Sequence, residues 1–155
     1  MFKVDNEAEL LAAFRPKDRE LIELTPGTKF PVIVRGYHAW QHPAGGRVFV
    51  LFAVADGAPT GIVFDSNGAG PHVPHMCDWC HSLGPGAHAG LLTAYVNSRK
   101  RAGIHVCSDL SCKQKLEEEA DRTGRSAHVG IDKVVQRMAK FAHDVLGIDL
   151  SGANR

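Results

Sequence analysis

The sequence lacks any long hydrophobic stretch. Its longest apolar run covers residues 48–55, which is less than half of the roughly 20 residues that cross a bilayer. The chain also turns polar at Lys3 and shows no apolar core of the kind that secretion signals carry. We therefore expect a soluble, cytoplasmic protein with no membrane partner.

An excess of charge of either sign is also missing. The chain has 18 Lys and Arg against 17 Asp and Glu, for a formal net charge of +1. Coating of nucleic acid draws on many Lys and Arg contacts, so this balance disfavours that function. With 44% hydrophobic and 23% charged residues among 155, the composition is that of one globular domain.

Common catalytic signatures are absent as well. The sequence contains no His-Glu-x-x-His helix motif, no Gly-x-Ser-x-Gly elbow and no glycine loop that would cradle a phosphate. These absences predict that the protein is not an enzyme and has no small-molecule substrate.

The four cysteines carry the strongest positive signal. Two residues separate Cys77 from Cys80, four separate Cys107 from Cys112, and 26 lie between the two pairs. In a reducing compartment an even number of cysteines does not indicate disulfides. Two close pairs supply the four thiolates that a closed tetrahedral zinc site requires. We predict one structural Zn²⁺ bound by these four residues.

The sequence around the two pairs predicts a treble-clef zinc finger. Cys77 and Cys80 lie in a knuckle-like turn, residues 104–107 read as the end of a strand, and Cys112 falls in the first turns of a helix. Five residues of helix advance about 7.5 Å, so the second pair of sulfurs converges only if Cys107 precedes the helix. Four thiolates fill the coordination shell and leave no position for water, which favours a structural metal.

Other interpretations of these residues stay open. His105, two residues before Cys107, could replace a cysteine as ligand, and Cys77 with Cys80 could form a redox pair or remain unliganded. The treble clef also occurs in histidine-dependent nucleases, but no paired carboxylates lie near the cysteines to complete such a site. Three further histidines are close enough in sequence to support the ligands from outside the coordination shell: His72, His75 and His81.

Periodicity in the first half of the chain predicts a helix followed by strands. Residues 6–15 form the helix, with Asn6 as its cap and Glu9 three residues later. Three strands are expected at residues 30–37, 47–56 and 61–65, with Trp40 between the first two. The short connection between the last two strands predicts an antiparallel hairpin.

Beyond residues 66–75, which read as a linker, the second half predicts two helices. One covers residues 108–120, capped by Ser108 or Asp109, and the other residues 131–146, ending before Gly147. The fold class is therefore α+β. An antiparallel sheet with an N-terminal helix occupies residues 1–65, and a treble-clef region with C-terminal helices occupies residues 76–155. We expect the two parts to form one compact unit.

Three segments of the second half also resemble a known family. They read MCDWCHSL at residues 76–83, LLTA at residues 91–94 and HVCSDLSC at residues 105–112. As a set they resemble the treble-clef zinc-finger domain of the elongation factor G-binding proteins, which include the fusidic-acid-resistance proteins. The resemblance implies a zinc-bearing domain that binds elongation factor G and, in the resistance proteins, promotes its release from stalled ribosomes.

Two functional classes follow for this sequence. One is a non-enzymatic module that binds a translation factor, with Arg99, Lys100, Arg101 and the exposed face of the helix at residues 131–146 as contacts. The other is a zinc module that binds RNA or the ribosome through the same three basic residues. The near-neutral charge favours the protein partner, since three basic residues give only a weak phosphate contribution.

Overall fold

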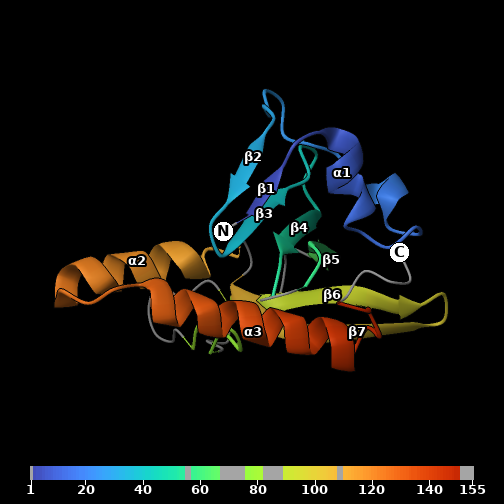
Figure 1. The fold of residues 1–155 in the computed structure, drawn as a ribbon. Coiled ribbons are helices and arrows are strands. Elements are labelled where there is room, and N and C mark those ends of the chain that lie inside the picture. Colours follow the sequence, from blue (N-terminus) through green and yellow to red (C-terminus); the bar gives the residue numbers. More distant parts are fainter. Residues whose placement is uncertain (1, 55–56, 67–75, 82–88, 108–109, 151–155) are drawn as a thin grey trace.

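The computed structural model shows a mixed helix and antiparallel-sheet protein, as the sequence predicts (Figure 1). It describes residues 2–54, 57–66, 76–81, 89–107 and 110–150. No helix in these ranges has the length and apolar character needed to cross a membrane. The elements, in chain order, are β1 (Phe2–Val4), α1 (Glu7–Ala12), the short 3-10 helix η1 (Arg19–Leu21), β2 (Val32–Val34), β3 (Tyr37–Gln41), β4 (Arg47–Phe52), β5 (Thr60–Ser66), β6 (Ala89–Asn97), β7 (Lys100–Cys107), α2 (Cys112–Thr123) and α3 (His128–Asp144).

Helix α1 begins at the predicted cap. The Asn6 side chain accepts a hydrogen bond from the Glu9 backbone N–H at 2.8 Å, and the Glu9 carboxylate accepts one from the Asp5 N–H at 3.1 Å. The helix is shorter than the predicted 6–15, because the chain leaves it at Ala13 and buries Phe14 completely in the core. The cap therefore fixes where the helix starts, and burial of Phe14 accompanies its end.

The single strand predicted at residues 30–37 is wrong. Gly36 adopts a φ of +72°, a conformation that costs glycine little, and it divides this region into β2 and β3. β2 pairs with β1 in a separate two-stranded sheet, whereas β3 pairs with β4. Trp40, which the sequence analysis placed between strands, lies inside β3.

Strands β3 to β7 form one antiparallel sheet in sequential order. The predicted β4–β5 hairpin is confirmed, with Val50 opposite Ile62. The β6–β7 hairpin joins the same sheet because Asp65 pairs with Thr93 and Ser66 with Leu92. Ser66, which was expected to begin a linker, is the last residue of β5, while residues 67–75 lie outside the described ranges.

The β3–β5 part of the sheet has a hydrophobic core on each face, because alternate side chains point to opposite sides. The core on the N-terminal side contains Val4, Leu10, Phe14, Val34, Trp40, Phe49, Leu51 and Val63. The core on the zinc side contains Val50, Phe52, Ile62, Phe64, the cysteines Cys77, Cys107 and Cys112, Trp79 and the inner face of α3.

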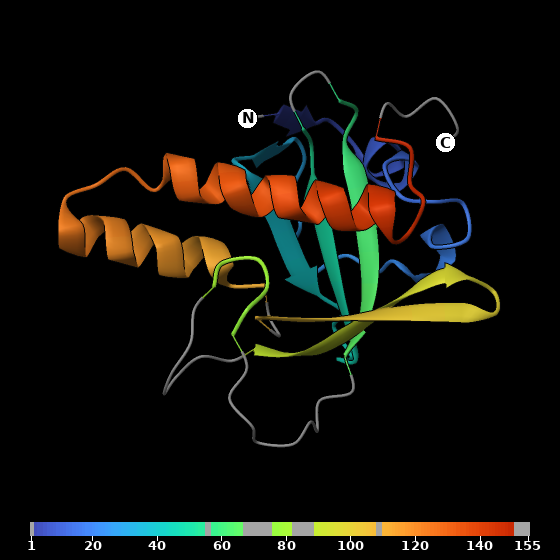
Figure 2. The same cartoon turned by 90° about the horizontal axis from the view of Figure 1, so that it is seen from below.

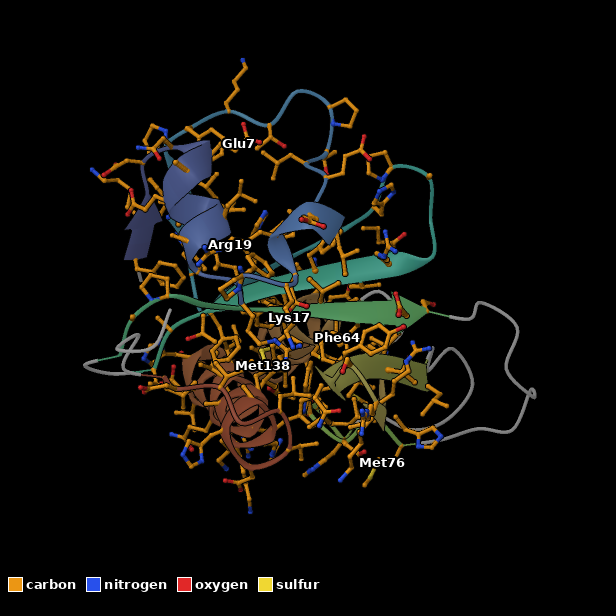
Figure 3. The ribbon with its side chains drawn as sticks, turned by 90° about the vertical axis from the view of Figure 1, so that its right-hand side faces the viewer. Glu7, Lys17, Arg19, Phe64, Met76 and Met138 are labelled. Carbon is orange, nitrogen blue, oxygen red and sulfur yellow. The ribbon has the colours of Figure 1, made fainter. Side chains whose placement is uncertain are left out.

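Helix α3 crosses β3, β4 and β5 on the zinc side, with α2 alongside it (Figure 2). Met138, on the inner face of α3, is fully buried in the same core as Phe64 of β5 (Figure 3). The helix covers most of the predicted range of residues 131–146. Its buried side chains recur at helical spacing, as an amphipathic packing helix requires.

Candidate metal centre

The first cysteine pair lies in a turn that is fastened to β7. The backbone N–H of Asp78 donates to the carbonyl of His105 at 2.8 Å, and the His81 N–H donates to the carbonyl of Cys77 at 2.8 Å. Both bonds fold the short segment back on itself and against the strand. This local geometry is what turns both sulfurs of a Cys-x2-Cys sequence toward one point.

The second pair lies at the junction between β7 and α2. Cys107 is the last residue of β7 and Cys112 the first residue of α2. The N–H of Leu110 donates to the Cys107 carbonyl at 2.8 Å, and Leu110 itself has a φ of 55°. Cys107 thus precedes the helix, as convergence of the two sulfurs requires. The prediction that this helix begins at residue 108, with Ser108 or Asp109 as its cap, is wrong: α2 begins at Cys112 with Ser111 at the N-cap position, and residues 108 and 109 lie outside the described ranges.

The four cysteine sulfurs form a compact cluster. The Sγ atoms of Cys77 and Cys112 are 3.6 Å apart, those of Cys80 and Cys107 are 3.7 Å apart, and all four lie within 4.8 Å of one another. A tetrahedral zinc with bonds of about 2.3 Å places its sulfurs about 3.8 Å apart. The cluster therefore fits one zinc ion with four thiolate ligands.

His81 and His105, the two candidate histidines that the structure describes, stand apart from this cluster. His105 does not belong to it, although it lies on the same strand as Cys107. His81 is exposed, and His72 and His75 lie outside the described ranges. A structural zinc site of four cysteines is what the described residues assemble.

Hydrogen bonds from the protein offset the negative charge that four thiolates bring to one zinc. The backbone N–H groups of Cys80 and Cys107 point to the Cys77 sulfur at 3.4 and 3.3 Å. The Lys115 ammonium lies 3.1 Å from the Cys107 sulfur. Donors of this kind favour the thiolate form, which is the form that binds metal.

The same closeness keeps the four thiols from ionising together in the absence of metal. Hydrogen bonds from Cys112 and Cys77 lower the pKa of Cys107 to about 6. The Cys107 thiolate, in turn, raises the pKa of Cys77 and of Cys112 well above the ordinary value. Zinc must therefore displace protons from the site, and its affinity increases with pH.

Comparison with known proteins assigns this centre to a family. Residues 19–145 match the family model described as the FBP C-terminal treble-clef zinc-finger. The chain belongs to this family. No protein in the curated collection matches. A solved structure, "Structure of the fusidic acid resistance protein FusC", is similar at 16% sequence identity with a TM-score of 0.49. The match covers 73% of this chain and 50% of that one.

A tyrosine connects the FBP zinc finger to the sheet. The Tyr37 hydroxyl donates to the Leu110 carbonyl at 2.6 Å and accepts from the Lys113 backbone N–H at 2.8 Å. Burial, together with the nearby Cys112, raises the pKa of Tyr37 and keeps the phenol neutral. Tyr37 thereby links β3 to the segment between Cys107 and Cys112 and to the start of α2. Sequence analysis missed this role, since Tyr37 and Leu110 are 73 positions apart in the sequence.

Trp79 anchors the turn between Cys77 and Cys80, the knuckle of the FBP zinc finger, in the hydrophobic core. Its side chain is 1% exposed and packs edge-on against Phe64 at 5.8 Å and Phe141 at 6.4 Å between ring centroids. Its backbone carbonyl accepts a hydrogen bond from the Arg137 side chain of α3. One of the two residues between the knuckle cysteines, Trp79, is thus an anchor in the core.

The three basic residues predicted as partner contacts lie at the other end of the hairpin. Lys100 lies seven positions before Cys107 along β7, a distance of about 23 Å. Arg101 is held there by an ion pair with Asp65 at 2.7 Å and lies over the Tyr95 ring at 4.7 Å. Arg99 and Lys100 are exposed, and their side chains form no ion pair within the described ranges.

Proposed function

We propose that this protein binds elongation factor G and acts as a non-enzymatic interaction module, with an effect on release of the factor from the ribosome as a further step. Family membership carries the proposal. The matched residues 19–145 contain the whole zinc centre and the β6–β7 hairpin, and the three motif segments resemble the elongation factor G-binding proteins. The zinc itself is assigned no chemistry, because four thiolates leave no position for a reacting water.

Two exposed basic regions could contact the partner. One is the hairpin tip with Arg99 and Lys100. The other is the face of α3 that carries Lys133, Arg137 and Lys140, spaced at i, i+4 and i+7 so that they lie on one side of the helix. Arg137 reaches the Trp79 carbonyl, so this second region lies beside the zinc knuckle. The first region lies at the end of the β6–β7 hairpin far from the zinc site and the second lies beside that site. Either can contact an acidic surface of the partner.

The three predicted contacts at the tip are not equivalent. The Asp65 carboxylate already neutralises much of the charge of Arg101, whereas Arg99 and Lys100 keep theirs. We therefore assign steering of the partner to Arg99 and Lys100, and stiffening of the hairpin to Arg101. Exposed charges of this kind change the association rate and its salt dependence more than they change the final affinity.

Calorimetric titration of the zinc-loaded protein with purified elongation factor G tests the proposal. We expect measurable binding that weakens severalfold when Arg99, Lys100 and Arg101 are all replaced by Ala. A matched control replaces Lys3, Lys29 and Arg35 by Ala, which removes the same number of positive charges outside the zinc region. The control should leave the binding unchanged, and zinc analysis should show that both variants keep their metal.

The RNA interpretation makes the opposite prediction. It requires no heat with elongation factor G at about tens of micromolar, together with tight binding to ribosomal RNA that falls steeply with salt. Equal weakening by the two triple variants would also count against a specific role for the hairpin tip, because it would reflect net charge alone.

A further inference from the structure

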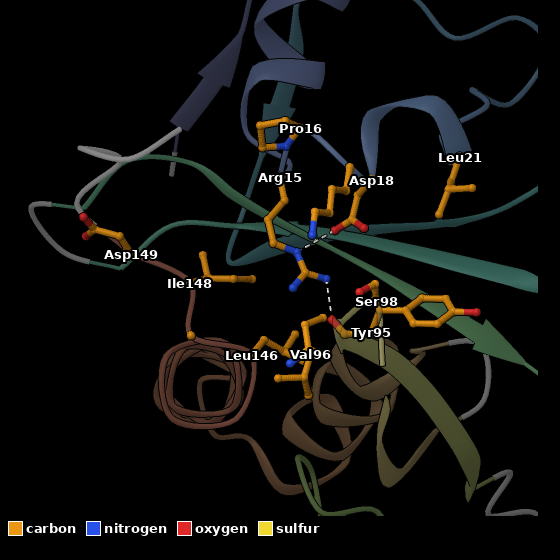
Figure 4. Close-up of a pocket in the computed structure, with 13 residues that line it drawn as sticks. Arg15, Pro16, Asp18, Leu21, Tyr95, Val96, Ser98, Leu146, Ile148 and Asp149 are labelled. Carbon is orange, nitrogen blue, oxygen red and sulfur yellow. Dashed lines mark hydrogen bonds and ion pairs between the residues drawn. The ribbon is translucent and has the colours of Figure 1, made fainter. Parts of the chain in front are cut away.

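A cavity of about 550 Å³ lies where three distant parts of the chain meet. The first is the segment between α1 and η1, which contributes Arg15, Lys17 and Asp18. The second is the hairpin tip, residues 95–98, and the third is the segment after α3, residues 146–149 (Figure 4). Its size is in the range of pockets that hold drug-sized small molecules. It is separate from the zinc site, which contributes none of its walls.

The centre of this cavity is organised by Arg15. Its Nε donates to the buried Asp18 carboxylate at 2.8 Å, and one terminal nitrogen donates to the Tyr95 carbonyl at 2.7 Å. Figure 4 shows the Arg15 side chain reaching from its own segment toward the hairpin, with Ile148 on one side. The other terminal nitrogen has no partner among the described residues, so the guanidinium keeps free N–H donors.

Three further lining residues, Lys17, Asn97 and Ser98, also carry donors with spare capacity. Lys17 is exposed and forms no ion pair or hydrogen bond within the described ranges. The Ser98 hydroxyl and the Asn97 amide nitrogen lie in the same wall, again without a partner in that part of the structure. Arg15 and Lys17 carry two positive charges, and Asp18 offsets one of them. The Asp149 carboxylate lies at the rim, away from Arg15 (Figure 4).

The other walls of the cavity are apolar. Leu146 and Ile148, each 4% exposed, form one side, and Val96 and Leu21 continue the surface. A molecule in this cavity would therefore meet hydrocarbon over most of its surface, the cations Arg15 and Lys17 at one place, and the Asp149 carboxylate only at the rim. Such a site selects ligands by the charge of one group, and it gains affinity from the apolar ligand surface that it buries.

We propose that the cavity binds an amphipathic organic anion. The apolar body packs against Val96, Leu146 and Ile148, and a carboxylate accepts hydrogen bonds from Arg15 and Lys17. The proposal concerns binding alone and assigns the molecule no chemical transformation. Its binding would link the N-terminal segment, the hairpin tip and the end of α3.

Straight-chain carboxylates are suitable probes. The full-length, zinc-loaded protein labelled with ¹⁵N is titrated with hexanoate, octanoate and decanoate below their micelle-forming concentrations, and amide resonances are followed. We expect saturable shifts at residues 95–98 and 146–149, with affinity rising about threefold to fourfold for each added methylene. Decan-1-ol has the same chain without the charge, and its affinity should be lower than that of decanoate by about tenfold or more.

Lys17→Met tests the anionic contact without disturbing the core, because Lys17 is exposed and makes no contact that the fold needs. It should weaken decanoate binding about tenfold and leave decan-1-ol binding unchanged. Lys29→Met, at an exposed position of the same N-terminal region outside the cavity, is the matched control and should change neither.

Three results would overturn the proposal. They are shifts that do not saturate, equal binding of decanoate and decan-1-ol, and equal effects of Lys17→Met and Lys29→Met. If elongation factor G perturbs the resonances of residues 95–98 and 146–149 while decanoate does not, the cavity is part of a protein interface and the ligand proposal is wrong. The proposal does not depend on elongation factor G binding, which the calorimetric titration tests separately.

Discussion

The two faces of the β3–β5 sheet are stabilised in different ways. On the N-terminal side Phe14, Trp40 and Phe49 pack ring against ring, with centroids 5.3 to 6.1 Å apart, and none of the described residues there belongs to the metal-binding cluster. On the zinc side Phe64, Trp79 and Phe141 make a similar cluster, but the segment that carries Trp79 is a short turn between two cysteines. On the N-terminal face the packed aromatic residues lie in or next to regular strands and a helix. On the zinc face one of them, Trp79, lies in a turn whose two cysteines bind the metal.

This difference indicates what the zinc is for. Fixing the backbone of the turn between Cys77 and Cys80 costs conformational entropy, and we expect the burial of Trp79 alone not to recover that cost. Zinc joins the turn to β7 and α2 through four bonds and makes the burial of Trp79 possible. The N-terminal core has an unbroken path of apolar contacts, so it should depend on the metal much less.

Removal of zinc should produce the largest difference in stability between the two faces of the sheet. Structural zinc contributes about 10–16 kcal/mol of apparent binding free energy in zinc-finger peptides, so chelation or Cys112→Ser should unfold the region from Cys77 to Ala120. The protein has one tryptophan in each core, Trp79 and Trp40, which provides a separate reporter for each. In a Trp40→Phe variant the fluorescence should shift to longer wavelength on chelation, as Trp79 becomes exposed to water.

The matching reporter is Trp79→Phe, in which Trp40 gives the signal. We expect its fluorescence to stay near that of the zinc-loaded protein after chelation, since Trp40 packs in the other core. If both reporters shifted together at the same chelator concentration, the two faces would be one cooperative unit and the contrast drawn between them would fail. Metal analysis that found no zinc, or disulfides between the cysteines, would contradict the zinc assignment itself.

Truncation of one aromatic ring on each face should give the next largest effect. Phe14→Ala and Phe141→Ala each remove a buried ring, and each should lower the free energy of unfolding by about 3–5 kcal/mol. The two variants should differ in zinc retention. Phe141→Ala should release zinc to a chelator faster, because Phe141 supports Trp79, whereas Phe14→Ala should release it at the wild-type rate. Equal release rates would show that the zinc-side core does not stabilise the metal centre.

Sequence spacing was enough to predict the zinc site. It was not enough to predict that the β6–β7 hairpin beside that site joins the β3–β5 sheet. The four cysteines and the break between Cys107 and α2 follow from local geometry, since ligand spacing and helix rise are properties of a few neighbouring residues. The joining of β5 to β6 rests on two residue pairs, at Asp65 and Ser66, and no local pattern records such a pairing. The treble clef was therefore predictable, and its position as the edge of a five-stranded sheet was not.

The errors in the N-terminal half have the same origin. Strand-favouring residues lie on both sides of Arg35 and Gly36, so the pattern predicts one strand. The left-handed turn at Gly36 reveals that two sheets share this region. β1 is three residues long and acquires its structure by pairing with β2. The cavity around Arg15 was not predictable either, because its three walls come from positions 15–21, 95–98 and 146–149.

Tyr37→Phe should have a smaller effect that is specific to the zinc side. The variant keeps the buried ring but leaves the Leu110 carbonyl and the Lys113 N–H without their hydrogen-bond partner, which costs about 1–3 kcal/mol. Because these two groups lie in and after the segment between Cys107 and Cys112, zinc release should also become faster. Urea unfolding and chelator kinetics measure the two quantities. A lower free energy of unfolding with unchanged zinc release would limit Tyr37 to an ordinary packing role.

The smallest expected effect concerns His38, on the N-terminal face of β3, where its ring stacks on Trp40 at 5.3 Å. Burial, followed by the positive charge of Lys113, lowers the pKa of His38 below its ordinary value of about 6.5. As the pH falls below about 6.5, the unfolded chain binds a proton at this histidine before the folded protein does, so the free energy of unfolding decreases. Above that pH both states are neutral at His38 and its contribution does not change.

His38→Gln should therefore flatten the pH dependence of stability between about pH 6.5 and pH 5 and leave stability at pH 8 nearly unaltered. Acid also protonates the zinc ligands, so the measurement needs excess zinc and the Trp79→Phe background, in which Trp40 reports the N-terminal core alone. If the slope below pH 6.5 is the same in the presence and absence of His38, then acid destabilises even this face through the metal centre. The two faces would then be coupled more tightly than their separate packing suggests, and the zinc would stabilise both.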